Sequence, residues 1–172
     1  MKMRIFVIAI STIFVALSAA WADTKVTASA GDWNAFEGTT SGNKPVGVCG
    51  VSRDTNNQYF GLKLFAGEDT FTIQMGSKRW QVAEKQKIGV TMIIDQHNPW
   101  NATGSTFRFA DGDMGIEYDI DKNQVGKFMA EFRGGGTIRI QFRNSGMPDW
   151  ALSLDGTGKL SDTFMACTRK LK

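Results

Sequence analysis

The chain holds a single histidine, His97, in the segment DQHNPW, and any hydrolase that uses histidine as its base depends on it. Imidazole is the side chain whose ordinary pKa lies nearest to neutral pH, which suits it to general acid–base catalysis. Asp95 stands close enough in the sequence to orient the ring. Because no G-x-S-x-G segment supplies a serine nucleophile, we interpret His97 as a turn residue and expect no enzyme. A hydrolase that uses His97 with Asp95, or with the acids between Asp111 and Asp121, is the less favoured alternative.

The carboxylates near the middle of the chain invite a calcium interpretation. Asp119, Asp121 and Asn123 have the D-x-D-x-N spacing with which an EF-hand loop begins. The pattern then fails, because Gln124 stands where the loop needs glycine and Ala130 where it needs a bidentate glutamate. We therefore expect a hairpin turn with solvated acids, and we expect neither a metal nor a cofactor.

Arginines suggest a different chemistry, the recognition of an anion. Arg139 and Arg143 alternate with apolar residues in GTIRIQFR, and Arg133 ends what we predict to be the preceding strand. They form either a basic stripe for an anionic partner or an ordinary charged face that discourages edge pairing. The turn that holds His97 and Trp100 is a second predicted contact region. The expected partner is a protein or an anionic surface ligand.

The first residues are typical of a secretory signal peptide. Lys2 and Arg4 precede an apolar run over residues 5–17, and Ala20 and Ala22 fit an A-x-A cleavage site. Cleavage after Ala22 removes residues 1–22 and sends the protein to the periplasm or outside the cell. The alternative is an uncleaved membrane anchor, which needs about 20 apolar residues.

Residues 23–172 are long enough for one domain with one core and too short to favour two. Without Lys2 and Arg4, the 20 basic residues of the chain become 18, against 17 acidic ones, so the net charge is +1 with histidine neutral. Nucleic-acid binding needs clustered basic charge that displaces counterions from phosphates. The charge balance therefore gives no case for a nucleic-acid partner.

Cys49 and Cys167 are the two cysteines of the chain. Export delivers both to an oxidising space in which paired thiols form disulfides. A redox or metal pair is the alternative, but no C-x-x-C is present and a metal site needs more ligands. We therefore predict a Cys49–Cys167 disulfide that ties the end of the chain to an early strand.

Short stretches in which apolar and polar residues alternate dominate the chain, and this period of two is typical of half-buried strands. Turns rich in glycine, asparagine and aspartate separate the stretches. The predicted strands span residues 59–65, 70–75, 88–95, 105–109, 115–120, 127–132, 136–143 and 150–154. The fold class is therefore all-β, an antiparallel β-sandwich or flattened barrel.

The end of the chain changes to a helical period. Its apolar positions recur at spacings of four and three, which places them on one face of a short C-terminal helix. These positions are Leu160, Phe164, Cys167 and Leu171. Thr157 or Ser161 is the expected N-terminal cap of the helix.

Several segments together resemble a known family. They are the exported N-terminus, AGDW at 30–33, Cys49 at an early strand, RW followed by IGVTMIID within 79–95, and WALSLDGTGKLSDTFMAC at 150–167. Over most of the chain they resemble the invasion-associated locus B family of small bacterial envelope proteins. The matching positions are Gly31, Asp32, Trp33, Leu154, Gly156 and the helix from Leu160 to Cys167.

The resemblance implies a β-sandwich and a non-enzymatic envelope protein, linked in the family to bacterial contact with host cells or entry into them. It brings no catalytic residues. We therefore expect an exported envelope protein that acts by binding. A periplasmic inhibitor or immunity protein that blocks a secreted enzyme is the alternative.

Overall fold

The computed structural model describes residues 23–40, 43–55 and 57–171, and the predicted signal peptide lies outside them. The described chain is built mainly of strands, with two α-helices and one short 3-10 helix. The strands are β1 (Asp23–Ala30), β2 (Trp33–Thr39), β3 (Gly47–Asp54), β4 (Gln58–Phe65), β5 (Thr70–Ser77), β6 (Lys87–Ile94), β7 (Trp100–Arg108), β8 (Met114–Asp121), β9 (Thr137–Arg143) and β10 (Trp150–Ser153). The helices are η1 (Lys122–Gln124), α1 (Val125–Gly134) and α2 (Thr157–Thr168). None of the helices in these ranges is long and apolar enough to cross a membrane.

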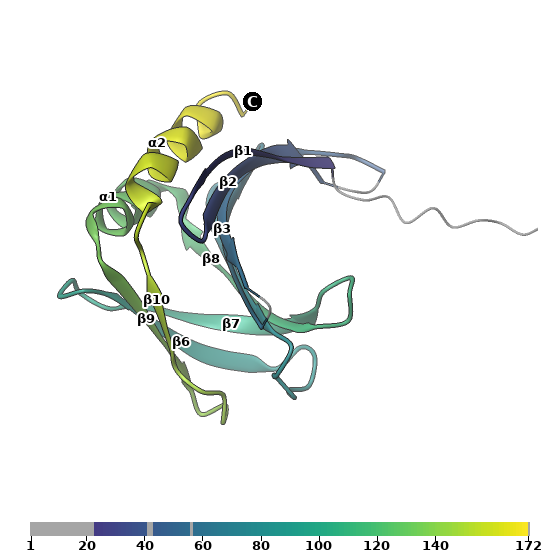
Figure 1. Ribbon diagram of the computed structural model, residues 1–172. Coiled ribbons are helices and arrows are strands. Elements are labelled where there is room, and N and C mark those ends of the chain that lie inside the picture. Colours follow the sequence, from purple (N-terminus) through teal and green to yellow (C-terminus); the bar gives the residue numbers. More distant parts are fainter. Residues whose placement is uncertain (1–22, 41–42, 56, 172) are drawn as a thin grey trace, which may run out of the picture.

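All ten strands belong to one antiparallel sheet with the order β1-β2-β3-β4-β5-β8-β7-β6-β9-β10. The sheet curls on itself, and α1 and α2 lie between its β1–β2 end and its β9–β10 end (Figure 1). In the described part of the chain no ladder joins β1 to β10, so hydrogen bonding does not close the sheet. The predicted all-β fold with a short C-terminal helix is confirmed.

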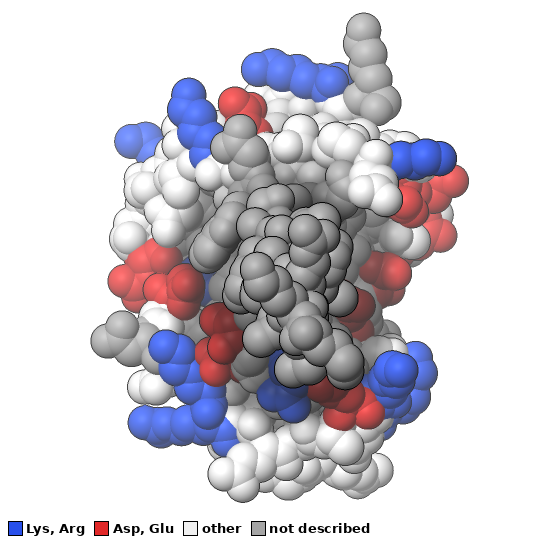
Figure 2. All heavy atoms as spheres, turned by 90° about the vertical axis from the view of Figure 1, so that its right-hand side faces the viewer, with Lys and Arg blue, Asp and Glu red and all other residues white. Residues whose placement is uncertain are grey.

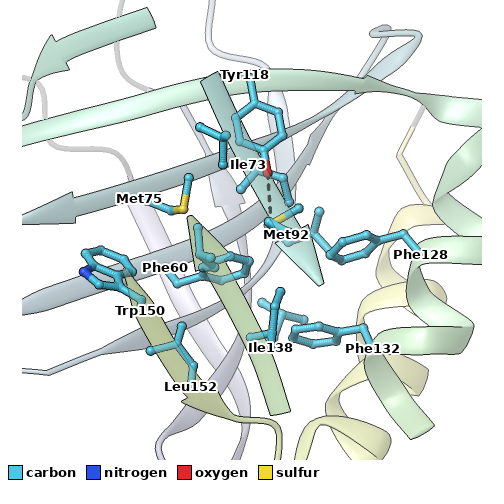
Figure 3. Close-up of a cluster of buried hydrophobic side chains, with 14 of the residues drawn as sticks. Phe60, Ile73, Met75, Met92, Tyr118, Phe128, Phe132, Ile138, Trp150 and Leu152 are labelled. Atoms are coloured by element: carbon cyan, nitrogen blue, oxygen red, sulfur yellow. Dashed lines mark hydrogen bonds between the residues drawn. The ribbon is translucent and has the colours of Figure 1, made fainter. Parts of the chain in front are cut away.

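The side chains that point to the inside of the curled sheet, from its opposite sides, form one hydrophobic core. On β9, Ile138, Ile140 and Phe142 are buried, while Arg139 and Arg143 between them are exposed, as the alternation predicts. Figure 3 shows side chains from opposite walls and from α1 converging on the same space. The core is packed with side chains and does not form an open barrel lumen.

The segment 127–132 is helical, and its prediction as a strand is wrong. Phe128, Met129 and Phe132 are all buried, and this spacing places them on one face of α1. The two phenylalanine rings stack with their centroids 5.8 Å apart. A strand would have turned Met129 away from both, so the adjacent apolar pair was the signal for a helix.

The β6–β7 turn is shorter than predicted. The expected turn over residues 95–104 ends at Pro99, and β7 begins at Trp100. The polar run Asn101–Thr103 has the exposed, half-buried, exposed pattern of a strand whose outer face meets solvent. The asparagine and threonine of this run, with the glycine that follows it, concealed the strand, because these residues are also common in turns.

α2 joins the C-terminus to the first strands. The Cys49–Cys167 disulfide links β3 to α2 with Cα atoms 5.9 Å apart, which confirms the predicted pairing. Leu160 and Phe164 are buried, and Leu171 packs at the edge of the core. The helix packs on α1 and on β1, β2 and β3.

The N-terminal cap of α2 differs from the prediction. The cap residue is Gly156, with φ of +92°, and no side chain caps the first turn. Thr157 is instead the first helical residue, and its buried hydroxyl interacts with the carbonyl oxygens of Phe132 and Leu154, each at 2.8 Å. Ser161 lies one turn further on and donates to the Thr157 carbonyl.

The two segments that carry the family resemblance, AGDW and SLDG, meet in space. The Trp33 indole N–H donates to the Ser153 carbonyl at 2.9 Å, across the gap between β2 and β10. A Cβ atom on Gly156 would lie 2.7 Å from the Ala30 carbonyl oxygen. Asp32, in the β1–β2 turn, pairs with Arg53 at 2.8 Å. The first two contacts join the two ends of the curled sheet, and the ion pair holds the β1–β2 turn on β3.

Candidate binding cleft between β7 and β8

β7 and β8 are paired over only half of their length. The ladder joins residues 105–108 of β7 to 114–117 of β8. Beyond it the strands diverge, and in the described structure no ladder pair joins residues 100–104 to 118–121 (Figure 1). Each stretch remains paired on its other side, β7 with β6 and β8 with β5. We call the space between these two stretches the β7–β8 cleft.

Gly104 lies at the narrow end of the cleft. A Cβ atom at this position would collide with Cγ2 of Ile116 and would lie 3.1 Å from the carbonyl oxygen of Glu117. A residue without a side chain is therefore needed where β7 makes its last close approach to β8.

Backbone groups of β7 face the cleft without a partner strand. The Thr106 N–H donates to the Gln86 carbonyl at 2.9 Å, and the Thr106 carbonyl accepts from the Lys85 N–H at 2.8 Å. These bonds point away from β8. Because alternate residues of a strand direct their backbone groups to opposite edges, the N–H and C=O of Asn101 and Thr103 point into the cleft.

The same alternation orients β8. The backbone N–H and C=O of Ser105 point toward β8, and Ser105 is paired with Glu117. The backbone N–H and C=O of Glu117 therefore point toward β7. Asp119, one strand period further on, therefore points its N–H and C=O into the cleft. Both walls of the cleft are strand edges.

Two cavities lie along the cleft, and Tyr118 and Asp119 line both of them. The cavity nearer to α1 has a volume of about 340 Å³ and the other about 370 Å³. The first is also lined by Asn98, Trp100, Ala102, Ile120 and Lys127. The second is also lined by Thr72, Gln74, Lys87, Thr103 and Ser105. Each volume falls at the small end of the range for ligand sites, about 300–1,000 Å³.

Trp100 forms the rim of the cleft and is held in place by charged groups of α1. Its indole N–H donates to the buried carboxylate of Glu131 at 2.7 Å. The Lys127 ammonium lies 5.1 Å from the centre of its ring, and the Phe128 ring meets it edge to face at 5.4 Å. These three contacts fix the orientation of a half-buried indole beside the free strand edges.

The floor of the cleft combines apolar side chains with one buried hydroxyl, and the polar side chains of Asn98, Asn101 and Gln124 line the same cavity. Tyr118 is buried and donates its O–H to the sulfur of Met92 at 2.9 Å (Figure 3). Burial raises the pKa of Tyr118, so the phenol stays neutral. Ala102 and Ile120 are half-buried beside it.

The β8 side of the outer rim of the cleft is acidic, while Lys87 and Lys127 line other parts of the two cavities. Glu117, Asp119 and Asp121 alternate along β8 and face outward. Gln74 donates to Glu117 at 2.9 Å, and Thr72 donates to Asp119 at 2.7 Å. None of the three carboxylates takes part in an ion pair with another described residue.

The predicted arginine stripe is only partly assembled. Arg139 and Arg143 share the outer face of β9, as expected. Arg133 belongs to α1 and pairs with Asp162 of α2 at 2.9 Å, so it does not end a strand and its charge is balanced locally. Its contact joins the two helices.

His97 and Asp95 lie together in the β6–β7 turn, but Asp95 is engaged elsewhere. Its carboxylate oxygens accept the N–H groups of Gly136 at 2.8 Å and Thr137 at 2.9 Å. The bond from Gly136 has the largest effect in keeping the pKa of Asp95 below its ordinary value, and the bond from Thr137 has the next largest. The charges of His97 and Arg139 lower this pKa further. The arrangement fastens the turn to the start of β9.

The other predicted acids bind nearby backbone groups, and the expected hairpin turn after Asp119 is wrong, because β8 leads into η1, which Asp121 caps. Asp111 accepts the N–H of Asp113 at 3.1 Å, and Asp121 accepts the N–H of Asn123 at 3.1 Å. Among the described residues, no group of three or more histidine, cysteine, aspartate or glutamate side chains is arranged to hold a metal ion.

A larger cavity, about 650 Å³, lies at the far end of the same outer face, where β4, β5 and β8 are fully paired. The ring of Tyr59 lies over Gly61, and that of Phe109 lies over Gly76. Burial raises the pKa of Tyr59, and Asp54 adds to the effect. The aromatic side chains here cover bare backbone, and no free strand edge is present, in contrast to the β7–β8 cleft.

The sequence pointed to Trp100 as a predicted contact residue but not to Thr103, Tyr118 and Asp119, which line the cleft beside it. Gly104 was the available signal, because an isolated glycine inside a strand indicates a close backbone approach. The prediction of this segment as a turn hid that signal.

Comparison with known proteins shows a likeness in fold. No family model matches the chain, and no curated protein matches it. The crystal structure of invasion associated protein B from Bartonella henselae is similar, with a TM-score of 0.53 and 13% sequence identity over 85% of this chain and 100% of that chain. The resemblance seen in the sequence is therefore supported at the level of the fold.

Proposed function

We propose that this chain is an exported, non-enzymatic envelope protein that binds a protein partner in the β7–β8 cleft. The observation that carries the proposal is the cleft itself, where two free strand edges lie beside the fixed indole of Trp100. Aromatic residues with a polar tip are frequent anchors in protein interfaces.

Two observations support an extracytoplasmic location. A disulfide between distant parts of the chain forms and persists in an oxidising compartment. The chain also shares its fold with invasion associated protein B of Bartonella henselae. Cleavage after Ala22 would release the chain into the periplasm or to the cell surface.

Binding is also the function that the polar side chains support. Asp95, the residue best placed to assist His97, is bonded to backbone groups of β9. Basic and acidic side chains are interspersed over the side of the molecule seen in Figure 2, which suits a protein partner better than a polyanion. Arg139 and Arg143 remain a second contact face, for an anionic surface ligand.

A photo-reactive residue placed in the chain tests the binding site in living cells. We expect Asn101, at the rim of the cleft, to give one discrete cross-linked product. The same residue at Lys159, exposed on α2, is the control and gives none. The partner, once identified and purified, must bind the wild-type protein and lose affinity for Trp100→Ala. A third probe, at Arg139, tests the second contact face. Equal products from Asn101 and Lys159, or a product from the Arg139 probe alone, would contradict the proposed site.

Export is tested by the mature N-terminus and by protease accessibility. Mass spectrometry without reductant should find a chain that begins at Asp23, with the Cys49 and Cys167 peptides joined. Digestion on intact cells would place the protein at the surface, and digestion only after the outer membrane is opened would place it in the periplasm. A full-length cytoplasmic chain with free thiols would overturn the proposal.

A further inference from the structure

We infer that the partner enters the β7–β8 cleft as an extended segment that adds a strand to β7, with apolar and basic residues in alternation. The inference rests on the proposed function, because it names the form of the partner at the same site. It is drawn from the backbone edges, the floor and the charged rim of the cleft.

The backbone provides the first requirement of strand addition. Asn101 and Thr103 point N–H and C=O groups into the cleft, and β6 holds this part of β7 in strand conformation from the other side. At about 3.3 Å per residue, the free stretch over residues 100–104 accommodates a partner segment of roughly four residues. Main-chain hydrogen bonds to such an edge supply affinity in known cases of strand addition.

The floor of the cleft determines which side chains point inward. Trp100 and Ala102 of β7 and Tyr118 and Ile120 of β8 surround the first cavity. Every second residue of an added strand would point toward these four side chains. An apolar side chain there would bury surface that is now half exposed.

The rim determines the intervening residues, which would point outward. Glu117 and Asp119 line the β8 side of the cleft, and Asp121 follows them on the outer face of β8. None of the three forms an ion pair with another described residue, and the nearby ammonium of Lys87 donates to the Ser105 hydroxyl. Opposite charges on neighbouring strands contribute roughly 0.2–1 kcal/mol per pair. Lysine or arginine at the outward positions would complement this row of carboxylates.

A synthetic peptide in which valine alternates with lysine is the probe for the test. We expect it to bind the purified disulfide-bonded protein in calorimetry, at least tenfold more tightly than the same peptide with alternate amides N-methylated. N-methylation removes main-chain donors and preserves the side chains. A third peptide with glutamate in place of lysine should bind at least tenfold more weakly.

Two variants of one residue test the strand edge on the protein. Thr103→Pro removes an N–H that faces the cleft and is not used by β6, so it should weaken binding of the valine–lysine peptide at least fivefold. Thr103→Ala keeps the N–H and controls for loss of the threonine side chain, so the inference requires Thr103→Pro to lose at least fivefold more affinity than Thr103→Ala. The unfolding temperature of each variant shows that the fold is intact. If Thr103→Pro is unfolded, amide hydrogen exchange of the wild-type protein replaces it as the test. Addition of the valine–lysine peptide should then slow exchange at the N–H groups of Asn101 and Asp119, and unchanged exchange would overturn the inference.

The outcomes separate the two proposals. Equal binding of the plain and N-methylated peptides, or no binding at all, overturns the strand-addition inference. If a cross-linked partner is still found from Asn101 in cells, the proposed binding function stands with another form of ligand, such as a folded surface or a small molecule. If neither peptide nor cross-linked partner is found, both proposals fail.

Discussion

Gly104 controls the narrow end of the β7–β8 cleft, and its replacement tests that role. In Gly104→Ala, the new methyl group meets the Ile116 side chain and the Glu117 carbonyl. We expect a loss of about 1–3 kcal/mol in the free energy of unfolding, as in other overpacked sites. Gly126→Ala is the matched control, because its Cβ has no neighbour within 4 Å and α1 should gain about 0.5–1 kcal/mol. Urea unfolding of both variants checks the prediction, which fails if their stabilities change in the same direction.

The carboxyl group of Asp95 makes the stability of the fold depend on pH. Its backbone hydrogen bonds from Gly136 and Thr137 lower its pKa in the folded state below the ordinary value of 3.8. The charged carboxylate therefore stabilises the fold above that value, and the contribution is lost as the pH falls through the folded pKa. We expect Asp95→Asn to be less stable than the wild type at pH 7, with the difference shrinking in acid. Chemical unfolding across pH 2–7 measures it, and a difference that is constant with pH would contradict this role.

The helix α2 depends on the disulfide for its attachment to β3. The bridge spans a sequence separation of 118 residues, for which the chain-entropy model gives about 4–5 kcal/mol of stabilisation. We expect the double variant Cys49→Ala, Cys167→Ala to lose up to that amount while the sheet still folds. Circular dichroism and urea unfolding, compared with the reduced wild type, check this. A double variant as stable as the oxidised protein would show that packing alone holds α2.

Local patterns explain which elements the sequence predicted. The strict alternation around Ile138 and Ile140 gave β9 its correct faces, and the spacing of Leu160 and Phe164 gave α2. In α1, by contrast, Phe128 and Phe132 also fit a strand, and only the burial of Met129 between them decides for a helix. Short apolar runs do not distinguish these alternatives when read alone.

The cleft was beyond prediction for a different reason, because it arises from the choice of strand partners. β8 follows β7 in the chain, yet it pairs along its whole length with β5 and only in part with β7. The faces of Tyr118 and Asp119 follow from alternation, but their position beside an opening depends on pairing with residues more than forty positions away, such as Thr72. Periodicity contains no information about such pairing.

At the scale of the molecule, Gly156 packs closely on Ala30 where no backbone ladder joins the two ends of the curled sheet in the described chain. Gly156→Ala forces a side chain into φ of +92° and against the Ala30 backbone, with its Cβ 2.7 Å from the carbonyl oxygen. Gly67→Ala is the matched control, since it has φ of +81° but no neighbour within 4 Å. The backbone conformation costs each variant roughly 1–3 kcal/mol. We expect the unfolding temperature to fall further in Gly156→Ala than in Gly67→Ala. Equal decreases would show that the contact with Ala30 has no role in closure.

The open cleft is the central claim, and residue-resolved amide hydrogen exchange of the free protein tests it most directly. The account predicts fast exchange at Asn101, Thr103 and Asp119, whose N–H groups face the cleft, and slow exchange at Ala102 and Tyr118, whose N–H groups face β6 and β5. This alternation along both strands would establish two free edges in solution. Uniform protection from Asn101 to Arg108 would show that β7 and β8 are paired throughout, and would contradict both the cleft and the binding site built on it.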